Sequence, residues 1–311
     1  MQKFLLKFSY FSIPLLSAYL LIEYANRNIP NEYLTKIENF ERSVNDIEVL
    51  VFGSSHALRG INPDYFTDYY SFNMGMVGQP MQIDFEIFDK YKKQLNNLKV
   101  LIISISHFTL STNISEGRIA KRVPYYQHFY KLDLLSHYNL NRYTVLPSVG
   151  FKKATVNCIK FCVLGKKRKI ETNRYGYMGE GGLLVKDSLS FLTAANEAAL
   201  LHKDDNSYDI KNNLILLNRI IAWTSARNIK VFLIETPKTN EFQDIRDIKK
   251  TDLIDSTLFL LDSVNPNVTY QDYTELFKYK KYFRNPDHLN DFGAKEFTLV
   301  LNSKINELFK E

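Results

Sequence analysis

The segment Ile47-Glu-Val-Leu-Val-Phe-Gly-Ser-Ser-His56 decides the fold. Its first six residues are apolar except for one glutamate, and a glycine and two serines follow them directly. A short apolar run of this kind is typical of a strand that is covered on both faces of a sheet. We therefore expect a strand over residues 47–52 and, at Gly53, a turn that leads into a helix.

Further apolar runs follow, and segments with the periodicity of helices lie between them. We expect strands at 70–73, 99–106, 230–235 and 268–270, and helices at 31–44, 81–95, 210–221 and after Asn290. Strands that alternate with helices predict a parallel sheet with helices on both faces. The expected fold class is α/β, a three-layer sandwich around a parallel sheet of about five strands, preceded by a hydrophobic helix.

The N-terminal segment suits a membrane anchor. Residues 8–22 carry no charge and would form about 22 Å of helix, while a full span needs about 20 residues. Lys3 and Lys7 precede this run and Glu23 follows it, which favours a cytoplasmic N-terminus and an extracytoplasmic body. A cleaved signal peptide and a buried or surface helix are the alternatives, but no A-x-A cleavage site follows the run.

We expect a membrane anchor over residues 1–30 and one further domain over 31–311. Within that domain, residues 107–206 lack a strong strand signal and are rich in Tyr, Phe, Lys and Arg, so we expect an elaboration of helices and a mobile, glycine-containing loop. The net charge is +6, but no helix-turn-helix, zinc-finger or ribonucleoprotein motif is present, which argues against nucleic acid as a partner. The two cysteines, Cys158 and Cys162, lack the histidine partners of a zinc site, and we interpret them as packing residues.

Three polar segments follow or flank the predicted strands, and ligands bind parallel sheets beyond the carboxyl ends of the strands. The first, Gly53-Ser54-Ser55-His56, places hydroxyls at a helix N-terminus, where backbone N–H groups stabilise an oxyanion, although a serine there also serves as a helix cap. The second, residues 73–78, holds glycines that let a ligand approach the backbone. The third, Asn285-Pro-Asp-His-Leu-Asn290, precedes the last helix.

Together these segments resemble the sequence blocks of the SGNH (GDSL-type) hydrolases. The resemblance covers about residues 47–310 outside the elaboration, with Ser54 where the family has Asp. It implies a flavodoxin-like fold, Ser55 as the nucleophile, His288 as the base and Gly78 as an oxyanion donor, with no cofactor and no metal.

Two other positions depart from the family. The aspartate that the family places three residues before its histidine is Asn285 here, while Asp287 is adjacent to His288. The group that orients His288 is therefore Asn285, Asp287 or a backbone atom, or it is absent. The oxyanion asparagine after the third strand is also missing, and Ser106 or His107 is the candidate replacement.

The resemblance to membrane-anchored members that modify cell-envelope polysaccharides implies a serine esterase or O-acyltransferase that acts on an acylated glycan. His56 and His107 are candidate substrate contacts, although His56 is also placed to face the first helical turn. A non-catalytic glycan-binding or assembly protein is the alternative, because of the two departures. The sequence leaves open the acyl donor, the direction of transfer and the oligomeric state.

Overall fold

The computed structural model describes residues 1–106, 109–115, 117–134, 150–166, 170–179, 181, 188–203 and 210–309. The chain divides into two compact units, one of 1–35 with 120–170 and one of 36–119 with 171–311. The strands are β1 (Val49–Gly53), β2 (Ser71–Asn73), β3 (Val100–Ser104), β4 (Lys230–Glu235), β5 (Val268–Asp272), β6 (Phe283–Asn285) and β7 (His288–Leu289). The longer helices are α1 (Gln2–Asn28), α2 (Glu32–Ser43), α3 (Ser55–Gly60), α4 (Met81–Tyr91), α6 (Val123–Phe129), α8 (Phe151–Cys158), α9 (Ser188–Lys203), α10 (Ile210–Ser225), α12 (Ile248–Val264) and α13 (Asp291–Leu308). The short helical turns are η1 (Pro63–Tyr65), α5 (Gly117–Ala120), η3 (Ile159–Val163), α11 (Asn240–Gln243) and η4 (Lys280–Tyr282).

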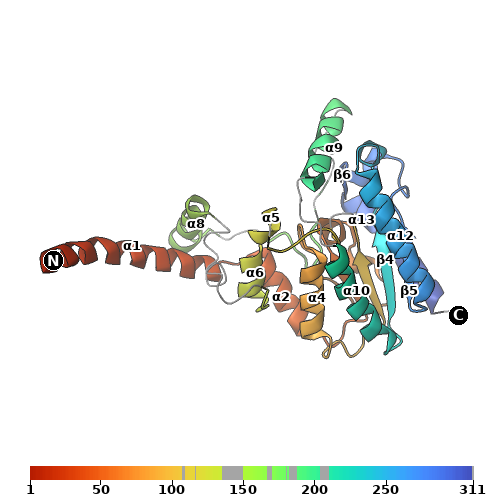
Figure 1. Cartoon of the computed structure of the whole chain (residues 1–311), viewed down its shortest axis with the longest axis horizontal. Helices are drawn as coiled ribbons and strands as arrows, with labels where there is room; N and C mark the ends of the chain where they lie inside the picture. The colour runs from red at the N-terminus through yellow and green to blue at the C-terminus, as the bar shows by residue number, and fades with distance from the viewer. Residues whose placement is uncertain are drawn as a thin grey trace. The chain divides into compact units, whose positions relative to one another are not determined.

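The second unit is built on a five-stranded parallel sheet with the order β2-β1-β3-β4-β5. Each strand pairs in parallel with its neighbour, so that Leu50 lies beside Leu101 and Leu101 beside Val231. This order, in which the second strand lies outside the first, is that of flavodoxin-like folds. The predicted α/β class with about five parallel strands is confirmed (Figure 1).

Helices cover both faces of this sheet because alternate side chains of buried strands point to opposite faces. One face presents Val51, Ile102 and Phe232 to a core that also contains residues of α3 and α13. On the other face, Phe72 of β2 contacts Phe40 of α2 at a ring-centroid distance of 5.4 Å. On that side α4 and α10 also pack against each other, and both contact the sheet. The result is the expected three-layer arrangement.

One long helix and one hairpin have no counterpart among the predicted elements. The helix α12 lies between β4 and β5, and buries Thr251, Ile254, Leu258 and Leu261 at helical spacing. The short antiparallel hairpin β6–β7 carries Asn285 and His288 as a pair. The hairpin matters for function because it sets how the last polar segment faces the sheet.

In the first unit, α1 is the one helix among the described residues that is long and apolar enough to cross a membrane. Its 27 residues correspond to about 40 Å, and its apolar window is not buried against the protein. The presence of a spanning-length apolar helix is therefore confirmed. Its orientation, its retention and the boundary at residue 30 stay predictions.

Candidate active site

The turn that carries Ser55, the predicted nucleophile, lies at the carboxyl end of β1. Gly53 has a φ of +131°, and a Cβ atom there would lie 2.6 Å from the carbonyl oxygen of Ser104, so only glycine fits this turn. Ser54 is the N-cap of α3 and accepts the backbone N–H of His56 at 3.4 Å. Ser55 begins the helix, and its Oγ lies 2.8 Å from Nε2 of His288. The capping role thus falls to Ser54, which leaves the Ser55 hydroxyl to the histidine.

Two side chains of the β6–β7 hairpin contact Nδ1 of His288, the ring nitrogen that does not contact Ser55. The Nδ1 atom of His288 lies 2.8 Å from Oδ1 of Asp287 and 3.1 Å from Oδ1 of Asn285. Asn285 also accepts the backbone N–H of His288 at 2.9 Å, which fixes the turn. The structure therefore brings both candidates within reach of the imidazole, and the carboxylate is the closer of the two. Ser55, His288 and Asp287 form a continuous chain of contacts.

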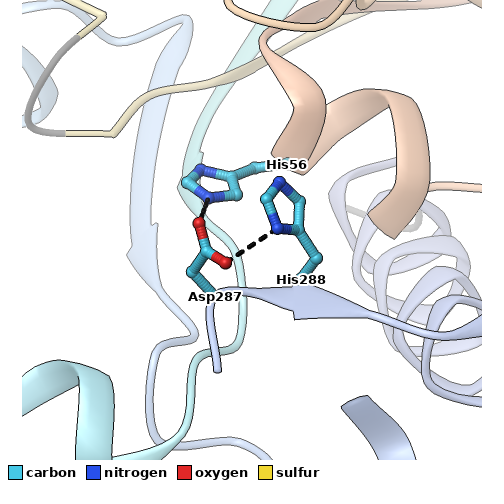
Figure 2. A group of neighbouring side chains, drawn as sticks. All are labelled: His56, Asp287 and His288. Carbon is cyan, nitrogen blue, oxygen red and sulfur yellow. Dashed lines mark hydrogen bonds and ion pairs between the residues drawn. The ribbon is translucent and has the colours of Figure 1, made fainter. Parts of the chain in front are cut away.

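His56 contacts the same carboxylate and lies next to His288, with ring centroids 5.0 Å apart. Figure 2 shows Asp287 bridging the two imidazoles, and Nε2 of His56 lies 3.6 Å from Oδ2 of Asp287. Burial lowers the pKa of His56 to about 3; Asp287 opposes this effect, while His288 and Lys238 add to it. His56 is therefore neutral at neutral pH and leaves the negative charge of Asp287 available to His288. Its predicted contact with substrate stays a prediction.

Two backbone N–H groups are available to an oxyanion. Gly78 has a φ of +67°, in the region that glycine adopts without strain. Within the ranges that the structure describes, the N–H groups of Ser55 and Gly78 have no hydrogen-bond acceptor in the protein. An oxyanion donor has to be uncommitted in this way, so both predicted donors meet that condition.

Ser106, the candidate oxyanion donor after β3, already has hydrogen-bond partners. Both the hydroxyl and the backbone N–H of Ser106 contact Oγ1 of Thr109, at 3.0 Å and 3.1 Å. Ser106 is thus engaged within its own turn, and its role as an oxyanion donor stays a prediction. His107, the other candidate, lies outside the described residues.

Hydrogen bonds of Asn73 connect the glycine loop after β2 to α3, the helix that begins at Ser55. The amide nitrogen of Asn73 donates to the carbonyl oxygens of Ala57 and Ile61, and its Oδ1 accepts the N–H of Gly75 at 2.9 Å. Asn73 is fully buried, so these three bonds satisfy its amide inside the protein. The sequence signal for this role was an asparagine at the end of a predicted strand, two residues before a glycine.

Buried ionisable and polar side chains surround the same loop. The ammonium group of Lys36 donates to the carbonyl oxygen of Gly75, and burial lowers the Lys36 pKa well below its usual value. Gln79 donates both to the carbonyl oxygen of Met74, at 3.2 Å, and to Oδ1 of Asp84, at 2.5 Å. No pattern in the sequence pointed to Lys36 or Asp84, because only the packing of α2 and α4 buries them beside the loop.

Replacing Asp84 with Asn is expected to remove a pH dependence of stability. Burial raises the pKa of Asp84 to about 7, against hydrogen bonds from Gln79 and Gly53 that lower it. A carboxyl with a raised pKa binds its proton more tightly in the folded state, so the wild type loses stability as the pH rises from about 4 to above 7. The expected loss is roughly 4 kcal/mol at about 1.4 kcal/mol per pKa unit. Urea unfolding of Asp84→Asn across this range should show a flatter profile, and parallel profiles for the two proteins would contradict the assignment.

Part of the central elaboration is packed against this site. Gly176 is so close to β2 that a Cβ atom would lie 2.1 Å from the carbonyl oxygen of Asn73. The N–H of Asn73 donates to the carbonyl oxygen of Tyr175 at 2.9 Å, and the hydroxyl of Tyr177 donates to Asp291 at 2.7 Å. Residues 170–179 are therefore packed against β2 and α13, where glycine permits close approach, and the expectation of a mobile loop stays a prediction.

His56, Asp287 and His288 are also residue types that coordinate Zn²⁺ in proteins. The relevant nitrogen and oxygen atoms of His56, Asp287 and His288 all lie within 4.8 Å of one another. Asp287 already contacts Nδ1 of His288 at 2.8 Å, so a metal that took its carboxylate would disturb that contact. Metal binding and orientation of the imidazole by Asp287 would therefore compete, and the predicted absence of a metal stays a prediction.

No protein-family model matches the sequence, and no curated protein matches it. Among solved structures, a Bacteroides fragilis protein provisionally named an acylhydrolase aligns over 88% of this chain and 97% of its own, with 12% identity and a TM-score of 0.44. A Streptococcus pneumoniae protein provisionally named a platelet activating factor aligns over 96% of this chain and 98% of its own, with 14% identity and a TM-score of 0.42. At these TM-scores neither likeness bears on the activity of this chain.

Proposed function

We propose that this protein is a serine esterase or O-acyltransferase of the SGNH type. The observation that carries the proposal is the 2.8 Å contact between Oγ of Ser55 and Nε2 of His288, with Asp287 2.8 Å from the other ring nitrogen. A hydroxyl, an imidazole and a carboxylate in this order are the parts of an activated serine nucleophile. Ser55 follows the carboxyl end of the parallel strand β1, which is where such sheets bind ligands.

In the proposed reaction, Oγ of Ser55 attacks the acyl carbonyl and its proton passes to Nε2 of His288. The backbone N–H groups of Ser55 and Gly78 receive the oxyanion, and Asp287 stabilises the imidazolium. Collapse of the tetrahedral intermediate breaks the ester C–O bond, and His288 protonates the departing alcohol. The acyl group is then on Ser55, and water or a sugar hydroxyl removes it by the same steps in reverse.

The proposed substrate is an O-acylated polysaccharide of the cell envelope. The support is the apolar helix α1, which suits a membrane anchor, and the resemblance of the three polar segments to membrane-anchored enzymes of this kind. The alternative is a non-catalytic protein that binds glycan on the same fold. The chain of contacts from Ser55 through His288 to Asp287 favours the enzyme, since a binding protein has no need of an activated serine.

Labelling with a fluorophosphonate probe separates these two functions. We expect the full-length protein to be labelled at Ser55, because the probe reacts only with a serine that a base activates. His288→Ala should abolish labelling, and Ser54→Ala should retain it, because Ser54 caps the helix and does not contact His288. Peptide mass spectrometry would locate the label. An unlabelled wild type, in a preparation that is folded by circular dichroism, would support the non-catalytic alternative.

A further inference from the structure

The helical segment 151–163, formed by α8 and η3, exposes apolar side chains that nothing in the described part of the protein covers. Val156, Ile159, Val163 and the following Leu164 are between 40% and 73% exposed. Exposed lysines lie among them, at positions 152, 153, 160 and 166, and no acidic residue occurs anywhere in 150–166. Apolar side chains mixed with lysines are typical of helices that lie in the plane of a membrane surface.

This segment is attached to one end of α1, within the same compact unit. The side-chain amide of Asn26 donates to the carbonyl oxygen of Ala154 at 3.2 Å, and both residues are buried at this contact. Figure 1 shows α8 beside the C-terminal part of α1. The position of α8 along the axis of α1 is therefore determined by a specific hydrogen bond.

That position coincides with the expected level of the lipid headgroups. Asn26 follows Ile22, the last residue of the uncharged run, by four residues, or about 6 Å along a helix. The polar layer of a bilayer is also about 6 Å thick on each side of the hydrocarbon core. If α1 crosses the membrane through that run, α8 is held in the polar layer.

We propose that residues 151–166 form an interfacial element that lies on the membrane that α1 crosses, with anionic lipid as its partner. This inference rests on the proposed anchoring by α1 and is independent of the chemistry of Ser55. The lysines attract anionic headgroups, and the exposed apolar side chains enter the boundary with the acyl chains. The element would fix the first unit against the bilayer at a second point besides α1.

The native cysteines provide a direct test, because Cys162 is exposed and lies between Ile159 and Val163. The full chain, with Cys158→Ser and a nitroxide on Cys162, is reconstituted in phosphatidylcholine nanodiscs with and without phosphatidylglycerol. Collisions of the nitroxide with oxygen and with a water-soluble nickel chelate are measured by electron paramagnetic resonance. We expect oxygen to dominate at Cys162 when phosphatidylglycerol is present, and the nickel chelate to gain when it is absent.

Two matched nitroxides, each in a background without native cysteines, make the outcome unambiguous. Leu16→Cys on α1 should report the hydrocarbon core, and Ser256→Cys on the exposed side of α12 should report water. A core signal at Leu16 with an aqueous signal at Cys162 would overturn the inference while leaving the anchor intact. An aqueous signal at both positions would reject the anchor and this inference together. In either case, fluorophosphonate labelling of Ser55 would be unaffected.

A triple variant tests whether the positive charge of the lysines holds the segment at the membrane. Replacing Lys152, Lys153 and Lys160 together by Gln is expected to raise collisions of the Cys162 nitroxide with the nickel chelate in phosphatidylglycerol nanodiscs. The oxygen signal at Leu16 should remain as in the parent protein. An unchanged Cys162 signal would show that anionic lipid is not the partner of these lysines.

Discussion

Ser55→Ala is expected to lower kcat/KM for p-nitrophenyl acetate by about 10⁴- to 10⁶-fold. The variant removes the atom that forms the covalent bond in the proposed reaction, while His288 and the proposed oxyanion donors remain. Because the hydroxyl contributes one contact at the surface of the nucleophile turn, we expect little change in the melting temperature. Steady-state rates of the two purified proteins, with thermal unfolding measured in parallel, test this expectation.

The adjacent serine is the matched control. Ser54→Ala removes a helix cap, which typically costs about 1 kcal/mol of stability. It leaves the 2.8 Å contact between Ser55 and His288 in place, so most activity should survive. A loss of activity in Ser54→Ala that equals the loss in Ser55→Ala would contradict the assignment of the nucleophile. Full activity in Ser55→Ala would remove the serine mechanism altogether.

Asp287→Asn is expected to lower kcat by about 10⁴-fold, the cost typical of replacing the carboxylate of a serine triad. The amide that replaces the carboxylate carries no charge to stabilise the imidazolium, and it also places a donor near Nδ1 of His288. Asn285→Ala should cost less, because Asn285 lies farther from Nδ1 and contributes no charge. Its larger effect should be on the hairpin, where it accepts the backbone N–H of His288.

A double variant tests the same point by rescue. Asn285→Asp combined with Asp287→Asn moves the carboxylate to the position that SGNH hydrolases use, three residues before the histidine. Since Oδ1 of Asn285 already lies 3.1 Å from Nδ1 of His288, a carboxylate there should restore much of the activity lost in Asp287→Asn. Equal activity of Asp287→Asn and the wild type would instead show that Asn285 or a backbone group orients His288.

Much of the sheet could be predicted from local pattern. The predicted strand at 47–52 overlaps β1 over residues 49–52, and the predicted strand at 230–235 coincides with β4. Buried parallel strands are recognisable in sequence because both of their faces are covered, and apolar side chains therefore follow one another without alternation. The helix α12 escaped prediction because it carries exposed apolar residues such as Phe259 and Leu260, which blur the periodicity of its buried stripe.

The polar segments were also visible in the sequence, but their partners were not. Spacing along the chain left Asn285, Asp287 and a backbone or absent partner as open alternatives for the support of His288. Only the hairpin of β6 and β7, with its sharp turn between them, brings Oδ1 of Asp287 within 2.8 Å of the ring. The contact between His56 and Asp287 likewise could not be predicted from spacing along the chain.

The sequence by itself determined the α/β class, the segment that carries Ser55 and the one that carries His288, because each depends on residues close together in the chain. Strand length, apolar pattern and turn residues act locally, so a single sequence contains them. The tertiary structure decided which groups support the pair: the closeness of Asp287, the neutral state of His56 and the burial of Lys36 and Asp84 beside the glycine loop. Distances and burial depend on segments far apart in the chain, and hydrogen bonds and pKa values follow from them.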